Sequence, residues 1–97
     1  MNESKPPYDL HPQGGGGFVT FELSAEKASI QLIALDKATL RGEGETLLVL
    51  EFNRRSIQVA GAGLAPLTDL LLSGRVKTIR PGTHEGCSVT EVRLYEE

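Results

Sequence analysis

The strongest constraint on this sequence is an apolar run, a short polar break and a second apolar run. Residues 46–52 carry one charge, residues 53–56 read Asn-Arg-Arg-Ser, and apolar side chains return at 57–60. A loop of two or four residues keeps like side chains on one face, whereas three residues would mix the faces, because side chains alternate along a strand. We therefore predict a β-hairpin with residues 53–56 at its tip, Phe52 opposite Ile57 and Leu50 opposite Val59.

Residues 64–73 predict a short helix, over about 65–73. Four leucines fall on one helical stripe, with a proline near the start and a glycine just past the end. These residues are Leu64, Leu67, Leu70, Leu71, Pro66 and Gly74. Leu72 leaves this stripe, so we expect it at the surface, either isolated or as part of a subunit contact.

The other segments favour strands. Residues 18–23, 75–79 and 88–95 are rich in β-formers, residues 42–45 form a turn, and residues 83–86 read as a polar loop. Residues 28–36 fit a strand or a helical face, and we favour the strand, which residues 38–41 either continue or follow as a separate one. The order predicts an α+β fold, a small mainly antiparallel sheet of about five to seven strands with one short helix packed on it.

The sequence also divides near residue 17. Residues 1–17 hold three prolines and a run of four glycines, and Leu10 is their one aliphatic residue beyond Met1. Such a stretch has little apolar surface to bury against its ordering entropy, so we expect a flexible arm. Residues 18–97 are expected to form a single globular domain.

Composition narrows the possible settings. Ten basic against thirteen acidic residues give a net charge of −3, which argues against a protein that grips nucleic acid by overall basicity. No apolar run is long enough to span a bilayer, and residues 1–17 lack the apolar segment of a secretory signal. A single cysteine, Cys87, suits a reducing compartment, and we expect a cytoplasmic protein with no membrane association, cofactor or metal.

The local sequence Gly61-Ala62-Gly63 lies between a predicted strand and a predicted helix. This placement resembles the start of a dinucleotide-binding fingerprint, in which backbone amides face a pyrophosphate. Arg80, at the end of the next strand, could then meet a 2′-phosphate. Pro66 occupies the third glycine position and offers no N–H, so we favour a structural reading in which the glycines turn the chain tightly.

Cations gather at two places. Arg54 and Arg55 lie at the predicted hairpin tip, and a second group comprises Arg75, Lys77, Arg80 and Arg93. If the strands of 75–79 and 88–95 share a face, this second group forms a basic stripe able to bind phosphates. The three phenylalanines read as core, so no aromatic platform accompanies the stripe, and nucleic-acid binding is the less favoured reading.

His84, Glu85 and Cys87 bring an imidazole, a carboxylate and a thiol together. Nucleophilic catalysis would need His84 to deprotonate Cys87, and metal binding would need three or four ligands. His11 is the only other imidazole, and sequence neighbours on a loop do not fix such geometry. We expect no catalytic residues.

The pattern Ile57-x-Val59-x-Gly61-x-x-Leu64, followed by Gly74-Arg75-Val76 and Ile79, resembles the small bacterial YabP/YqfC-type sporulation proteins over about residues 38–80. The resemblance implies a β-rich assembly or morphogenetic module without catalytic residues. This chain departs from the pattern at Pro66, at its cationic turn and in its N-terminal stretch.

Together these features favour a non-catalytic interaction or assembly domain, a homo-oligomer or the binder of a further protein. The alternative is a module that binds a phosphate-bearing ligand or nucleic acid at residues 61–63 or on the basic stripe. An enzyme centred on His84 and Cys87 ranks third.

Overall fold

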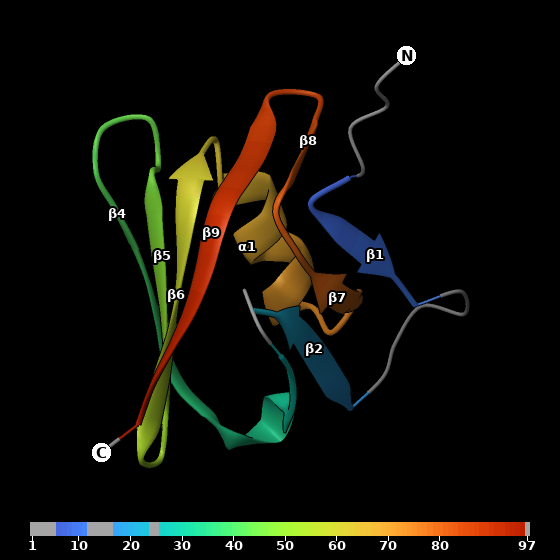
Figure 1. The fold of residues 1–97 in the computed structure, drawn as a ribbon, viewed down its shortest axis with the longest axis vertical. Helices are drawn as coiled ribbons and strands as arrows, with labels where there is room; N and C mark the ends of the chain where they lie inside the picture. The colour runs from blue at the N-terminus through green and yellow to red at the C-terminus, as the bar shows by residue number, and fades with distance from the viewer. Residues whose placement is uncertain (1–5, 12–16, 24–25, 97) are drawn as a thin grey trace.

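The computed structural model describes residues 6–11, 17–23 and 26–96. Within these ranges nine strands form two sheets, with one helix beside them (Figure 1). The first sheet has the order β1-β7-β2-β3, and the second sheet β4-β5-β6-β9-β8. The strands are β1 Tyr8–Leu10, β2 Phe18–Glu22, β3 Lys27–Gln31, β4 Leu35–Arg41, β5 Leu47–Phe52, β6 Arg55–Ala62, β7 Val76–Ile79, β8 Gly82–His84 and β9 Cys87–Glu96.

The predicted α+β class is confirmed, and the pairs are antiparallel except for β2 with β7. The expectation of one sheet with five to seven strands is wrong in detail. Both sheets and the helix contribute to one core: Phe21 and Ile79 from the first sheet, Leu50 and Val59 from the second, and Leu67 from the helix are all fully buried. Two sheets therefore enclose apolar side chains that a single sheet was expected to cover.

The chain passes from the first sheet to the second at residues 32–34. Here the ambiguous segment 28–36 ends its strand β3, makes a 3₁₀ turn, Leu32–Ala34, and continues as β4. The strand prediction is thus right for most of the segment and wrong for its middle. Ile33, at the turn, is 90 % exposed, so it does not belong to the buried helical face that the sequence also allowed.

The predicted hairpin is β5 and β6, but its loop is shorter than expected. Residues 53 and 54 alone make the turn, so Phe52 pairs with Arg55 and Leu50 with Ile57. The predicted partners are therefore wrong by two residues. Because side chains repeat every two residues, this slip leaves Leu50, Phe52 and Ile57 on the buried face as expected.

Helix α1 spans Ala65–Leu72, close to the prediction. Leu67 and Leu71 are buried in the core, whereas Leu72 is 54 % exposed, as its position off the stripe predicted. The helix ends in a Schellman motif: the N–H of Gly74 donates to Leu71 and that of Arg75 to Leu70. Gly74 adopts a φ of +78°, the left-handed conformation that this ending requires.

The predicted arm is partly ordered. Residues 8–10 form β1, which pairs antiparallel with β7, and Pro7 is fully buried. For residues 6–11 the expectation of a flexible arm is therefore wrong, because backbone pairing along an open strand compensates for the scarcity of apolar side chains. Residues 1–5 and 12–16 of the predicted arm lie outside the described residues.

The predicted loop at 83–86 is a tight hairpin instead. β8 pairs with β9 through Gly82 and Val89, Thr83 and Ser88, and His84 and Cys87. Glu85 and Gly86 turn the chain with φ of 49° and 84°. Two successive residues with positive φ make the turn typical of two-residue hairpins, and glycine adopts this left-handed conformation without strain.

Candidate interaction surface

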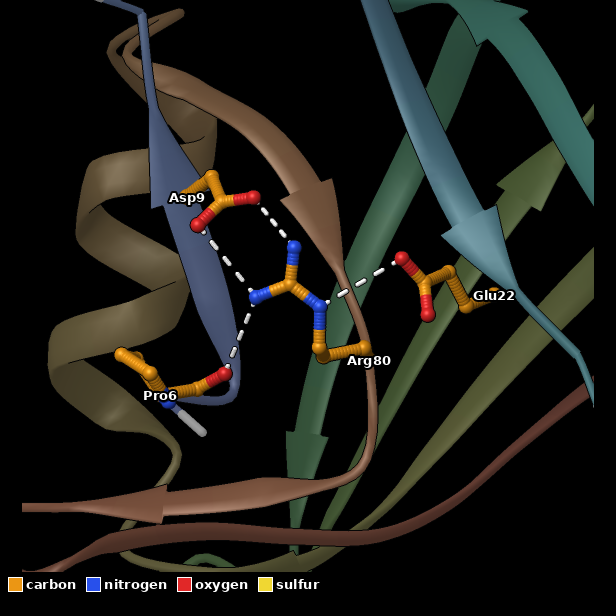
Figure 2. Close-up of polar contacts among 4 residues, drawn as sticks. All are labelled: Pro6, Asp9, Glu22 and Arg80. Atoms are coloured by element: carbon orange, nitrogen blue, oxygen red, sulfur yellow. Dashed lines mark hydrogen bonds and ion pairs between the residues drawn. The ribbon is translucent and has the colours of Figure 1, made fainter. Parts of the chain in front are cut away.

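Arg80 lies at the end of β7 and joins three strands of the first sheet. Figure 2 shows its guanidinium between Asp9 of β1 and Glu22 of β2. Nη1 and Nη2 donate to the two carboxylate oxygens of Asp9, Nη1 also donates to the carbonyl of Pro6 at 3.1 Å, and Nε approaches Glu22 Oε2 at 3.4 Å. The hydrogen bond to Asp9 is the main cause that raises the pKa of Arg80.

This arrangement makes Arg80 a structural cation. Its side chain is only 14 % exposed, and its backbone N–H donates to the carbonyl of Pro7 at 2.8 Å. With the forked contact to Asp9, the contact to Glu22 and the bond to Pro6, four of the five N–H groups of the guanidinium donate to protein groups. Arg80 therefore anchors β1 to the sheet and is not open to a phosphate.

The other members of the predicted basic stripe are divided between the sheets. Arg75 precedes β7 and Lys77 lies within it, both exposed, whereas Arg93 lies on β9 of the second sheet. Arg93 Nε contacts Glu91 Oε2 at 2.6 Å, and this contact is the main cause that raises the pKa of Arg93. The condition for a stripe, that the two strands share a face, is not met.

The glycines of residues 61–63 serve the fold. The N–H of Gly61 donates to Thr46 at 2.9 Å, that of Gly63 to Gly44 at 2.8 Å, and that of Leu64 to Glu45 at 3.2 Å. These amides are thus turned to the β4–β5 loop and are not available to a pyrophosphate. A Cβ on Gly61 would overlap the backbone carbonyl of Ser88, so β6 and β9 can approach closely only with glycine there.

The residues considered for catalysis, His84 and Cys87, lie on the two strands of one hairpin. His84 and Cys87 are paired across the β8–β9 hairpin, but Cys87 is buried, and this burial raises the pKa of its thiol. His84 contacts Glu85 at 3.2 Å and the ring of Tyr8 edge-on at 6.4 Å between centroids. Within the described ranges no three His, Cys, Asp or Glu residues are placed to hold a metal ion.

Arg54 and Arg55 lie at the tip of the β5–β6 hairpin, both exposed. Arg55 lines a shallow pocket of about 330 Å³ between the hairpin tip and the edge strand β3. Phe18 lines the same pocket. Phe18 was expected in the core but is 52 % exposed, because it begins β2 with its side chain on the outer face. This pocket gathers one cation, the exposed ring of Phe18 and the buried ring of Phe52, and one exposed ring is no platform for stacking successive bases.

A feature that the sequence analysis missed is the edge of β9. β8 pairs with β9 only as far as Val89, and among the described residues no strand pairs with residues 91–96 on that side. We call these residues the β9 edge. Pairing of β6 with β9 shifts between Ala60 and Gly61, so a bulge at Thr90 separates the paired end of β9 from this edge.

A groove runs beside the β9 edge. Its volume is about 430 Å³, and it is lined by residues 91–96 together with Leu23 and Glu26 from the ends of β2 and β3. A second hollow of about 360 Å³ adjoins it at Leu23, Glu91 and Val92. Val92 is buried, Leu94 is half-buried, and Glu91, Arg93 and Tyr95 face outward. The groove thus offers backbone groups beside the apolar side chains of Leu23 and Leu94, within a lining that also includes charged residues.

The peptide groups of every second residue in the β9 edge point into this groove. A two-residue hairpin closes on a hydrogen-bonded pair, here Phe52 with Arg55, and the alternation of an antiparallel ladder then directs Ser56 and Gln58 towards β9. It follows that the N–H and C=O groups of Val92, Leu94 and Glu96 point away from β6. The sequence held one signal for this edge. The last predicted strand, residues 88–95, is longer than the segment 83–86 before it, so that segment could not pair with its whole length.

Within the described residues no helix is long and apolar enough to cross a membrane. Comparisons of the chain with protein-family models, with curated proteins and with solved structures found no match. The resemblance to the YabP/YqfC-type proteins therefore stays a prediction.

Proposed function

We propose that this chain is a non-catalytic protein-interaction domain that binds an extended segment as an additional strand at the β9 edge. The observation that carries the proposal is a strand edge that no described strand pairs with, beside a groove of about 430 Å³ lined in part by Leu23 and Leu94. Strand addition gains main-chain hydrogen bonds from the edge, and alternate side chains of the bound segment enter the groove. We place the domain in the cytoplasm, on the basis of its single cysteine.

The β9 edge suits this role better than the other edge of the same sheet. β4 has a register shift between Leu35 and Lys37, and it exposes Asp36 and Lys37. Irregular pairing and charges are features by which natural sheets prevent strand addition. On the β9 edge Glu91 and Arg93 lie on the outer face, while Val92 and Leu94 face inward beside Leu23, with Glu96 as the one charged residue on their side.

The phosphate-binding alternative receives less support from the same geometry. Its glycine amides donate within the protein, Arg80 is held by two carboxylates, and Arg93 is paired with Glu91. Arg54 and Arg55 at the β5–β6 turn, and Arg75 and Lys77 at β7, remain as two separate pairs of exposed cations. We therefore rank this alternative second.

Selection of binders from a displayed library of random peptides tests the proposal. The chain is used as the bait at a concentration below micromolar. Leu94→Lys places a charge at the inner side of the β9 edge, which opposes strand addition. Leu40→Lys is a matched control, because Leu40 is also a half-buried leucine packed against the core on an edge strand of the same sheet.

We expect the wild-type chain and Leu40→Lys to enrich the same peptides and Leu94→Lys to lose them. Bound peptides should slow amide hydrogen exchange at Val92, Leu94 and Glu96. Equal enrichment by the wild-type chain and Leu94→Lys, or protection confined to another strand, would show that the β9 edge is not the docking site.

A further inference from the structure

We propose that the strand taken up at the β9 edge is β9 of a second copy of this chain, paired antiparallel about a two-fold axis at Leu94. This inference rests on the proposed function and names its partner. The second sheets of the two copies would then form one continuous sheet across the axis. The result is an isologous dimer, in which the same surface serves both subunits.

The side chains of β9 are self-complementary for such pairing. A two-fold axis pairs residues whose numbers add to an even sum, so inward side chains always meet inward ones. With the axis at Leu94, the two Leu94 side chains meet beside Leu23, and Val92 of each copy stands opposite Glu96 of the other. The peptide groups that face the groove belong to the same residues, so backbone pairing and apolar contact coincide.

Three positions of the axis can be compared, and two of them conflict with the structure. An axis at Val92 would bring Tyr95 of the second copy opposite Val89, where Gly82 of β8 already pairs. An axis at Arg93 would place the two Arg93 side chains directly opposite each other, and like charges in this position repel.

An axis at Leu94 avoids both conflicts. It sets Leu94 against Leu94 at the centre and pairs residues 92–96 of each copy, well clear of β8. Arg93 then stands opposite Tyr95 of the second copy on the outer face, twice by symmetry. A guanidinium beside an aromatic ring is a favourable cross-strand pair, and Glu91, 2.6 Å from Arg93 Nε in its own copy, holds the cation in place.

Disulfide cross-linking distinguishes these positions. In a Cys87→Ala background, single cysteines are introduced as Val92→Cys, Arg93→Cys and Leu94→Cys, with Glu51→Cys on the exposed face of β5 as the control for random collision. With the axis at Leu94, the two residues 94 have Cα atoms about 5.5 Å apart, within the range of a disulfide. Residues 93 are about 8–9 Å apart and residues 92 about 14 Å, beyond that range.

We expect Leu94→Cys to cross-link in a glutathione redox buffer at least tenfold faster than the other three variants. Fastest cross-linking at Val92→Cys or Arg93→Cys would overturn the position of the axis. A rate for Leu94→Cys equal to that of Glu51→Cys would overturn the second copy as the partner. Light scattering on chains without introduced cysteines adds a second measurement. The wild-type chain and Leu40→Lys should be dimeric at concentrations where Leu94→Lys is monomeric.

The failure of this inference differs from that of the proposed function. Peptide selection that depends on Leu94, without cross-linking above the control, would leave an interaction domain that binds other proteins and refute self-pairing. Cross-linking at Leu94 without any selected peptide would support self-pairing and refute the uptake of foreign segments.

Discussion

Gly61→Ala tests whether the glycines at 61–63 exist for packing or for ligand binding. The added Cβ would overlap the carbonyl oxygen of Ser88 and lie 2.7 Å from the carbonyl carbon of Ser88 and 2.9 Å from Val89 Cα. Ordinary van der Waals contact begins at 3.4 Å, so β9 would have to move by at least 3.4 − 2.7 = 0.7 Å. The obstacle is backbone on a strand paired on both sides, which cannot swing away as a side chain does.

The expected cost follows from two opposing effects. Overpacking costs about 1–3 kcal/mol, and each backbone hydrogen bond weakened by the shift of β9 costs about 1 kcal/mol. Alanine reduces the conformational freedom of the unfolded chain, which returns about 0.4–1 kcal/mol. We expect Gly61→Ala to lower the free energy of unfolding by about 3 kcal/mol. For a chain of this length this corresponds to a fall in Tm of roughly 12–24 °C.

Urea unfolding followed by circular dichroism measures this change, and Gly17→Ala provides the control. Gly17 has no heavy atom within 4 Å of an added Cβ and no positive φ, so its substitution should change stability by less than about 0.5 kcal/mol. A Gly61→Ala chain as stable as Gly17→Ala would refute the packing argument and return the glycines to a functional interpretation.

Three further results are expected. Arg80→Met should lower the free energy of unfolding by only about 1–2 kcal/mol, since its carboxylate partners stay in contact with water, and should speed amide exchange in β1. Because burial raises the pKa of Cys87, its contribution to stability should be complete below about pH 8.5 and decline above it; Cys87→Ala should lack that decline in urea unfolding between pH 7 and 10. Leu67→Ala should cost about 2–5 kcal/mol by the same assay and Leu72→Ala less than about 0.5 kcal/mol, because Leu67 is fully buried and Leu72 is 54 % exposed.

Local patterns predicted the local elements well. The hairpin of β5 and β6 follows from alternating apolar residues, and α1 follows from the leucine stripe closed by Gly74. The exposure of Leu72 also follows from its angle on the helix. The length of the hairpin turn was less determined, because turns of two and four residues leave every side chain on the same face.

Long-range pairing was beyond the sequence pattern. Nothing near residues 8–10 indicates a strand, because β1 owes its conformation to β7 and to Arg80, about seventy residues later. Arg80 was considered for phosphate binding because its carboxylate partners, Asp9 and Glu22, lie 71 and 58 residues away in the sequence. The division into two sheets depends on the short turn Leu32–Ala34, whose residues are apolar and resemble the strands around them.

The candidate surface arises from the same division. Two open sheets have four edge strands, whereas a single open sheet has two. Each edge strand must be paired, covered or made irregular to prevent unwanted association. β1 and β3 are the edges of the first sheet; in the second sheet β4 is irregular and charged, and β8 covers β9 over three residues only. β8 begins only at Gly82, directly after Pro81, and so leaves Val92 and Leu94 beside a groove. An edge left open next to apolar side chains favours association, and it is on this edge that we expect the chain to act.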